Sequence, residues 1–136
     1  MKALIVGCGR VGSTLAKRLQ AAGWDVSVVD ESEEALVRLG DAWPGEFHVG
    51  HGMDTEVLEE AGIADADAVV VATDGDNTNI VVAQVAKVRY EVPSVAVRVL
   101  DPVRAEFYGG RGFHVVSPTK SAIESLASWA LDGAAR

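Results

Sequence analysis

The chain has 136 residues, 49% of them hydrophobic, which is enough for one sizeable core, so we expect a single domain over residues 1–136. Its formal net charge of -8 offers no basic field for the phosphates of a nucleic acid and excludes that class of partner. No apolar run approaches the ~20 residues needed to cross a bilayer, and a single cysteine cannot form an internal disulfide. We therefore expect a cytoplasmic protein with no direct membrane insertion.

Strands and helices are predicted to alternate along the chain. In the first half, strands are expected at Ala3–Val6, Val26–Val29 and, least clearly, Phe47–Val49. A helix with apolar residues at steps of four follows the first strand and ends at Gly23. The second helix is expected to be capped by Ser32, with Leu36 and Leu39 facing inward, and a third runs from Asp54 or Thr55 to Gly62.

The second half continues the same alternation. Strands are expected at Ala68–Ala72, Val95–Val99 and Phe113–Val116, and a long helix at Asn77–Tyr90. Asp101-Pro102 and Ser117-Pro118 each place a capping residue before a proline at the first helical position. Both dipeptides therefore predict helix starts.

Six strands alternating with helices predict an α/β fold with a Rossmann-like, doubly wound parallel sheet in the order 3-2-1-4-5-6. The core is expected over residues 1–117, followed by an amphipathic C-terminal helix over residues 118–132. Apolar residues gather on one face of that helix, at Ile123, Leu126, Ala127, Ala130 and Leu131. That face, and the apolar run Ile80–Val85, either form assembly surfaces or pack within the monomer.

The turn Gly7-Cys8-Gly9-Arg10-Val11-Gly12 is the clearest candidate site. The pattern G-x-G-x-x-G is weak alone, but here it follows a predicted strand and opens a predicted helix. Gly7 permits the tight turn, Gly9 lets the backbone approach a pyrophosphate, and Gly12 allows close packing of helix on strand. The sequence therefore predicts a nucleotide site, against the plainer interpretation that these glycines only shape a turn.

Asp30 ends the second strand, 18 residues after Gly12, where a carboxylate accepts hydrogen bonds from both ribose hydroxyls. The same charge repels a 2′-phosphate. NAD, ATP or ADP is therefore expected rather than NADP.

Two further residues of the turn have competing interpretations. Cys8 stands where a helix N-terminus lowers a thiol pKa, which suggests redox sensing, but a small residue filling a spacer position is the preferred interpretation. Arg10 is placed to fold over the phosphates or, at even odds, is an exposed helical arginine.

Other candidates follow the third, fourth and fifth strands. Thr73 and Asp74 are expected to line the cleft at the topological switch point, and Arg98 points there if its register is right. Asp74, Asp76 and Asn79 are alternatively turn or cap residues. His51 lies close to where adenine is expected, and as a lone histidine it is more often polar surface than metal ligand.

Several blocks in order resemble the N-terminal nucleotide-binding domain of the Trk/Ktr potassium-uptake regulatory proteins, the RCK/KTN or TrkA-N family. The resemblance covers the chain from Lys2 to Pro118. It rests on Gly7–Gly12, Val28-Val29-Asp30, Val57–Ile63, Ala68–Thr73 with Asn77-Thr78-Asn79, and Pro93–Asp101. Where the family usually has an acid after Gly50, this chain has His51.

The resemblance implies a cytosolic regulatory subunit, peripheral to the inner face of the membrane, that binds NAD(H) or ATP/ADP. It implies a homodimer or higher ring that gates a membrane potassium transporter or channel and catalyses no reaction. Gly7 to Gly12, Asp30, Thr73, Asp74 and Arg98 match nucleotide-contacting positions of the family. The family's frequent second, C-terminal domain has no counterpart in these residues, so we expect either a portion of a longer protein or a one-domain subunit.

Two other functions compete with this one. An NAD-dependent oxidoreductase needs a proton-transfer group, yet neither Tyr90 nor Tyr108 has a lysine four residues later. The other is an adenine-nucleotide sensor for a different cytosolic partner, because a fold does not determine a function.

Overall fold

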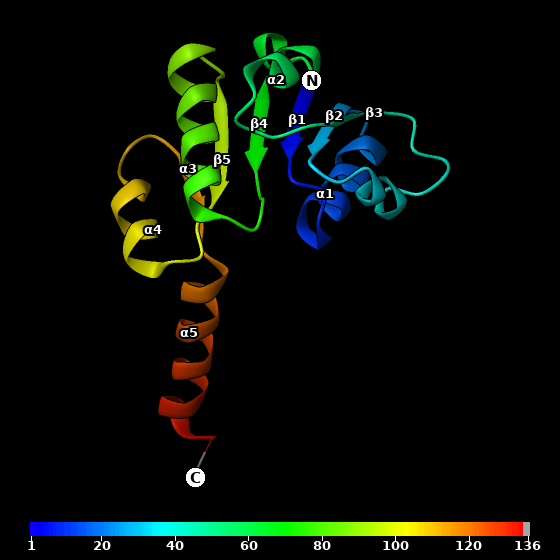
Figure 1. Ribbon diagram of the computed structural model, residues 1–136. Helices are drawn as coiled ribbons and strands as arrows, with labels where there is room; N and C mark the ends of the chain where they lie inside the picture. Colours follow the sequence, from blue (N-terminus) through cyan, green and yellow to red (C-terminus); the bar gives the residue numbers. More distant parts are fainter. Residues whose placement is uncertain (135–136) are drawn as a thin grey trace.

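The computed structural model describes residues 1–134 and contains the expected alternation of strands and helices (Figure 1). The strands are β1 (Lys2–Val6), β2 (Asp25–Asp30), β3 (Glu46–Val49), β4 (Ala68–Val71), β5 (Ser94–Arg98) and β6 (His114–Val116). The α-helices are α1 (Arg10–Ala21), α2 (Thr55–Glu60), α3 (Asp76–Gln84), α4 (Pro102–Gly109) and α5 (Pro118–Trp129). Shorter 3-10 or π-helical segments are η1 (Glu33–Arg38), η2 (Ile63–Asp65), η3 (Val85–Arg89) and η4 (Ala130–Ala134).

All six strands form one parallel sheet in the order β3-β2-β1-β4-β5-β6, which confirms the predicted topology. The register places Val6 of β1 opposite Val29 of β2 and Val71 of β4. The chain therefore leaves these three strands at one edge of the sheet. The glycine turn, Asp30 and Thr73 all follow at that edge, where ligands of open α/β sheets bind.

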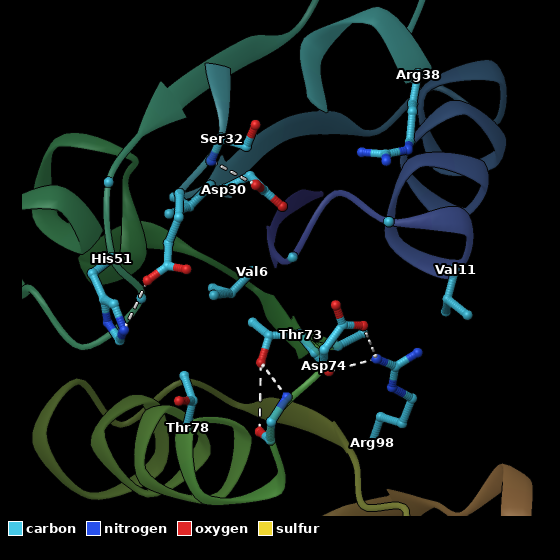
Figure 2. Close-up of a pocket in the computed structure, with 18 of the residues that line it drawn as sticks. Val6, Val11, Asp30, Ser32, Arg38, His51, Thr73, Asp74, Thr78 and Arg98 are labelled. Carbon is cyan, nitrogen blue, oxygen red and sulfur yellow. Dashed lines mark hydrogen bonds and ion pairs between the residues drawn. The ribbon is translucent and has the colours of Figure 1, made fainter. Parts of the chain in front are cut away.

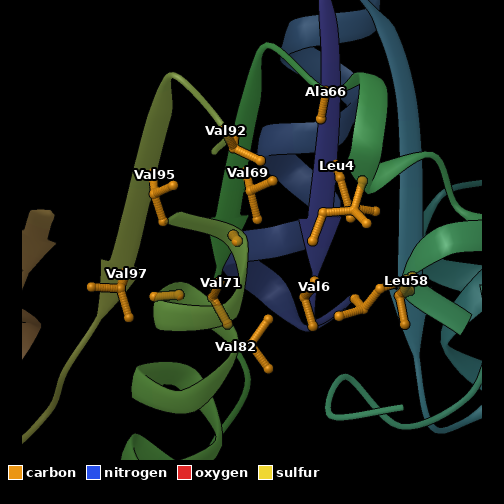
Figure 3. Packing of buried hydrophobic residues seen from close by; sticks show 14 of the residues in the cluster. Leu4, Val6, Leu58, Ala66, Val69, Val71, Val82, Val92, Val95 and Val97 are labelled. Carbon is orange, nitrogen blue, oxygen red and sulfur yellow. The ribbon is translucent and has the colours of Figure 1, made fainter. Parts of the chain in front are cut away.

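Both faces of the central strands are buried. Leu4 and Val6 face one hydrophobic cluster, while Ala3 and Ile5 face the other, because successive side chains of a strand point to opposite faces. Figure 3 shows Leu4 and Val6 beside Val69 and Val71 of β4, with Leu58 and Val82 packing over them. Each such side chain stabilises the fold by about 1.5–3 kcal/mol, so the sheet is a rigid base for the loops at its edge.

Most predicted helix ends are confirmed. Gly23, with φ of 91°, follows α1 in the left-handed conformation that ends many helices. The side chains of Asp54, Asp101 and Ser117 accept N–H hydrogen bonds at the starts of α2, α4 and α5. Capping residue and proline were therefore reliable signals here.

The second predicted helix is wrong in three respects. Residues 33–38 form a 3-10 helix, and the side chain of Ser32 makes no capping bond. Leu36 is exposed, whereas Ala35 and Leu39 are buried. The inward position of Leu39 is confirmed. Residues three apart share a face of a 3-10 helix, so the helix type alone does not separate Leu36 from Leu39; packing in the second hydrophobic cluster buries Ala35 in place of Leu36.

The long helix predicted at 77–90 is also more irregular than expected. Its α-helical part ends at Gln84 and continues as the π-helical η3. Ile80, Val82 and Ala83 of the run Ile80–Val85 are buried in the main hydrophobic cluster, so this run packs largely within the monomer.

The C-terminal helix projects away from the sheet (Figure 1). None of the residues of α5 is buried, and Ile123, Leu126 and Trp129 are at least half exposed. The apolar face that was expected to pack on something therefore has no cover within residues 1–134. Across those same residues, no helix has the length and apolar character that spanning a bilayer requires.

Candidate functional site

A cavity of about 600 Å³ opens at the edge of the sheet where the strands end. Nine of the eleven residues expected at a nucleotide site line it, and Cys8 and Gly12 do not. The nine are Gly7, Gly9, Arg10, Val11, Asp30, His51, Thr73, Asp74 and Arg98. The structure therefore brings together residues that lie at or directly after the ends of five strands, β1 to β5.

The glycine turn wraps tightly at the start of α1. Gly7 has φ of 106°, and a Cβ there would lie 2.6 Å from the carbonyl oxygen of Ala72. A Cβ on Gly12 would lie 1.7 Å from the carbonyl oxygen of Gly7. Both positions therefore require glycine, which explains how α1 comes so close to β1.

The start of α1 has the features of an anion site. Its N-cap residue Gly9 has no side chain to bond the first-turn N–H groups, and no acidic residue occupies that turn. Nothing lies within 4 Å of a Cβ built on Gly9, so open space faces the backbone there. Free N–H donors and a positive helix end suit a phosphate group.

Cys8 is buried beneath the turn instead of facing the cavity. Its thiol donates to the carbonyl oxygen of Ala35 at 3.4 Å, and its carbonyl oxygen accepts from Arg38 at 3.3 Å. Burial first, and then the charge of Asp30, raise the pKa of the Cys8 thiol above its ordinary value of 9.0. This direction is opposite to the lowered pKa that the redox interpretation requires, and the burial of Cys8 agrees with the preferred interpretation of a small residue in a spacer position. Cys8 does not line the cavity.

Asp30 joins the turn to the end of β2. Its Oδ2 accepts the N–H of Cys8 at 2.7 Å, and its Oδ1 accepts the N–H of Ser32 at 2.8 Å. A carboxylate has about four lone-pair sites, so each oxygen keeps capacity for a further donor. Figure 2 shows the carboxylate between the turn and the rest of the cavity, where a ribose diol fits its chemistry.

His51 borders a different end of the cavity from Arg98 (Figure 2). Its Nδ1 accepts the N–H of Met53 at 3.1 Å, and its Nε2 lies 3.0 Å from Oε1 of Glu31. The first bond leaves the proton of the neutral ring on Nε2, where it is donated to Glu31. In residues 1–134 no three histidine, cysteine or carboxylate side chains gather as metal ligands.

The opposite wall is built around Arg98 at the end of β5. Its guanidinium donates to the carbonyl oxygen of Thr73 and lies 3.5 Å from Oδ1 of Asp74. The pairing of Arg98 with Val116 of β6 shows that the register is the one that turns Arg98 to the cavity. The side chain is only 16% exposed, and its buried Nε lacks a hydrogen-bond partner.

Two neighbouring polar residues have structural roles. The amide of buried Asn79 accepts the N–H of Thr73 and donates to the carbonyl oxygens of Thr73 and Arg98, each at 3.0 Å. The carboxylate of Asp76 accepts two N–H groups of the loop after β5. Neither of these two residues lines the cavity and neither caps α3, whose N-cap is Gly75; both hold neighbouring strand ends and loops in place, whereas Asp74 lines the cavity.

Several lining residues were not predicted. Arg38 of η1, Glu31 and Glu34 contribute charge, and Thr78 of α3 contributes a hydroxyl. The position of Glu31, directly after Asp30 at a strand end, was the available signal. No sequence motif marks Arg38, because its position at the cavity depends on the 3-10 conformation of η1.

Comparison with known proteins gives one family. The TrkA-N domain model matches residues 3–118. The Trk system potassium uptake protein TrkA of Streptomyces coelicolor is 42% identical over 120 residues, covering 88% of this chain and 54% of that protein. A homolog of that protein from Methanothermobacter thermautotrophicus is 34% identical over 123 residues, covering 90% of this chain and 56% of its own length. The chain thus spans about half the length of these relatives.

Solved structures resemble the fold at lower identity. The Kef CTD of Shewanella denitrificans in AMP-bound form has a TM-score of 0.81 and 23% identity, covering 100% of this chain and 83% of that one. GsuK bound to ADP has a TM-score of 0.77 and 21% identity, covering 94% and 33%. The GsuK channel bound to NAD has a TM-score of 0.70 and 21% identity, covering 86% and 21%.

Proposed function

The chain belongs to the TrkA-N domain family, and from that premise we propose that it is the nucleotide-binding part of a regulatory subunit of a Trk/Ktr-type potassium transport system. The ligand is NAD(H) or ATP/ADP, bound in the cavity at the edge of the sheet. No chemical reaction is assigned to the chain. Its place is cytoplasmic, held at the inner face of the cell membrane by a potassium transporter or channel subunit.

The observation that carries the ligand proposal is the pairing of Asp30 with the glycine turn. One carboxylate stands beside first-turn N–H groups that have no side-chain cap, so acceptors for a ribose diol and donors for phosphate lie together. The glycine turn also lets a phosphate approach its backbone, because nothing lies within 4 Å of a Cβ built on Gly9. The proteins of similar fold that bind AMP, ADP or NAD agree with this chemistry.

The proposed mechanism is a change in population of two arrangements. A nucleotide changes the state of an assembly only if it binds one arrangement more tightly than the other. The cavity is lined by residues at or after the ends of five strands, so a bound ligand contacts segments that are separate in the sequence. We place the second arrangement in a homodimer or higher ring, in which the exposed apolar face of α5 is the assembly surface.

The oxidoreductase alternative loses its candidate proton donors. The Tyr90 hydroxyl donates to Glu59 at 2.6 Å, and this bond raises the pKa of Tyr90. Tyr108 packs edge-on against Phe107, and neither tyrosine lines the cavity. The third candidate is an adenine-nucleotide sensor for a different cytosolic partner. It shares the ligand of our proposal and differs only in the partner protein.

A thermal-unfolding series tests the ligand. We expect NAD, NADH, ATP or ADP to raise the melting temperature, since a ligand present at 100 times its Kd stabilises the native state by about 2.7 kcal/mol. NADP is expected to give a smaller shift. Asp30→Asn keeps one acceptor oxygen but removes the charge, so it should reduce the shifts given by NAD, NADH, ATP or ADP and narrow their difference from NADP, whose 2′-phosphate is no longer repelled. A flat response to all five nucleotides would refute nucleotide sensing by this chain.

Isolation of the partner tests the regulatory assignment. Affinity capture with the full chain from membranes of its source cell should retain a potassium transport protein, and more of it in one nucleotide state than in another. Recovery of a different stable partner, unrelated to ion transport, would support the third candidate and contradict ours.

A further inference from the structure

Arg98 is a cation whose charge is already balanced. The Arg98 side chain is only 16% exposed, and the carboxylate of Asp74 lies 3.5 Å from its Nη2. The Asp74 side chain itself is fully exposed. A phosphate that approaches Arg98 therefore meets a neutral pair instead of a free positive charge.

The charged residues that line the whole cavity also leave no excess of positive charge. Three arginines line it, at positions 10, 38 and 98, against four carboxylates, at positions 30, 31, 34 and 74. Asp30, Glu31 and Glu34 lie after β2, on the side of the cavity that suits a ribose. Asp74 is the one lining carboxylate of residues 1–134 that lies beyond β4, beside Arg98. Figure 2 shows the Asp74 and Arg98 pair apart from Asp30.

We infer that Asp74 is a specificity-determining residue that cancels the attraction of Arg98 and so disfavours nucleotides with additional terminal phosphates. The inference rests on the proposed nucleotide function. It assigns the cavity to ligands with few phosphate charges, a dinucleotide such as NAD(H) or a nucleoside monophosphate, in preference to a free nucleoside triphosphate.

The physical reason is the dependence of the Coulomb energy on charge. The pyrophosphate of a dinucleotide carries fewer charges than the chain of a triphosphate, and the N–H groups of the glycine turn are available to it. Each further phosphate adds negative charge that the pair of Arg98 and Asp74 does not offset. Because Asp74 is exposed, the effect is expected to be modest and to decrease with salt.

The test is Asp74→Asn, which keeps the size of the side chain and removes its charge. Affinities for NAD, AMP, ADP and ATP are measured by titration calorimetry in metal-free buffer at low salt. We expect ADP to bind about threefold and ATP about tenfold more tightly, with NAD and AMP changed by less than about twofold. The gain for ATP should shrink at high salt.

Asp65→Asn is the matched control. Asp65 precedes β4 as Asp74 follows it, so the control removes the same charge at the opposite edge of the sheet. An equal change for all four ligands, or the same change in Asp65→Asn, would overturn the inference. If no nucleotide binds the unmodified protein, the proposed function itself fails and this inference with it.

A double-mutant cycle tests whether Asp74 acts through Arg98. Direct repulsion of ATP by Asp74 does not depend on Arg98, whereas occupation of the Arg98 Nη2 by Asp74 does. If Asp74 acts by occupying Nη2, the effect of Asp74→Asn on ATP affinity should fall in the Arg98→Gln background to less than half of its value in the unmodified chain. An undiminished effect in that background would show that Arg98 is not involved, and would overturn the assignment of Asp74 as its counter-ion.

Discussion

Gly9 and Gly12 stand three residues apart in one motif but have different surroundings. A Cβ on Gly12 would overlap the carbonyl oxygen of Gly7 at 1.7 Å, whereas a Cβ on Gly9 would meet nothing within 4 Å. The backbone of Gly9, with φ of −81°, is also accessible to alanine. One glycine is therefore required by the fold, and the other only by the space that it leaves in the cavity.

The first prediction compares alanine at these two positions. Gly12→Ala should lower the free energy of unfolding by about 3 kcal/mol or more, because α1 must move away from the turn. Gly9→Ala should change stability by less than about 0.5 kcal/mol but weaken nucleotide binding, since its methyl group enters the cavity. Urea unfolding measures the first effect and calorimetric titration the second.

The opposite pattern would contradict this assignment. If Gly9→Ala bound nucleotide as well as the unmodified chain, the backbone approach of a phosphate at Gly9 would be wrong even though the fold remained correct. A stable Gly12→Ala variant would show that the close contact with Gly7 is not as the structure places it.

At the scale of elements, Asn79 ties together the ends of two strands and the start of a helix. It lies on α3, is 1% exposed, and bonds to backbone groups of Thr73 after β4 and Arg98 at the end of β5. These are the segments that carry one wall of the cavity. The position of Arg98 therefore depends on a residue that does not itself line the cavity.

We predict that Asn79→Ala destabilises the protein by about 2–3 kcal/mol, because it leaves buried backbone groups without partners. Asn77→Ala is the control on the same helix, since Asn77 is exposed and bonds only to Arg104 at 2.8 Å. It should cost less than about 0.5 kcal/mol. Chemical unfolding of both variants measures the difference, and equal losses would contradict the role given to Asn79.

Much of this arrangement could be predicted because it depends on local rules. A short apolar run that ends at a glycine turn indicates a strand of a parallel sheet. The strand order then predicts the edge of the sheet at which the carboxyl end of that strand lies. Asp30, Thr73 and Arg98 were therefore placed at one cleft without any knowledge of contacts. Asp101 and Ser117 correctly predicted the starts of their helices, because capping is a contact between residues that are close in the sequence.

The failures involve contacts that the local pattern does not contain. Leu36 was expected to face inward together with Leu39, but the packing of η1 buries Ala35 and Leu39 and leaves Leu36 exposed. The redox alternative for Cys8 depended on its position at a helix end, whereas burial beneath Ala35 raises the pKa of its thiol. Arg38 reaches the cavity only because η1 folds back over the turn. In each case tertiary packing decided the outcome.

At the scale of the whole molecule, α5 is the element that the rest of the structure leaves uncovered. Its polar residues pair along one side, with Lys120 near Glu124 and Ser128 bonded to Asp132. Its apolar residues occupy the other side and are exposed. A helix of 12 residues is marginal in water on its own, so the apolar face needs a surface to pack against.

A second copy of the chain satisfies this requirement most simply. Two identical helices related by a two-fold axis bury the same face on both sides, which is how most homodimers form. The face is continuous, because Ile123, Leu126 and Ala130 follow the i, i+3, i+7 spacing of a helix contact. The dimer of the proposed function is therefore expected to depend on α5, while the nucleotide cavity lies on a different part of each copy.

The corresponding prediction concerns mass in solution. The unmodified chain should sediment as a dimer or larger assembly, and Ile123→Glu with Leu126→Glu should give a monomer, because two charges per helix cannot be buried without partners. Ser125→Glu, on the polar side of the same helix, should leave the assembly intact. The fold should persist in all three, since α5 contributes nothing to the buried core, and nucleotide binding to the monomer should remain measurable. Sedimentation equilibrium with parallel thermal unfolding makes the comparison.

An unmodified chain that remains monomeric at every concentration would contradict α5 as the assembly surface. An assembly that survives the double substitution would show that the interface lies elsewhere on the molecule.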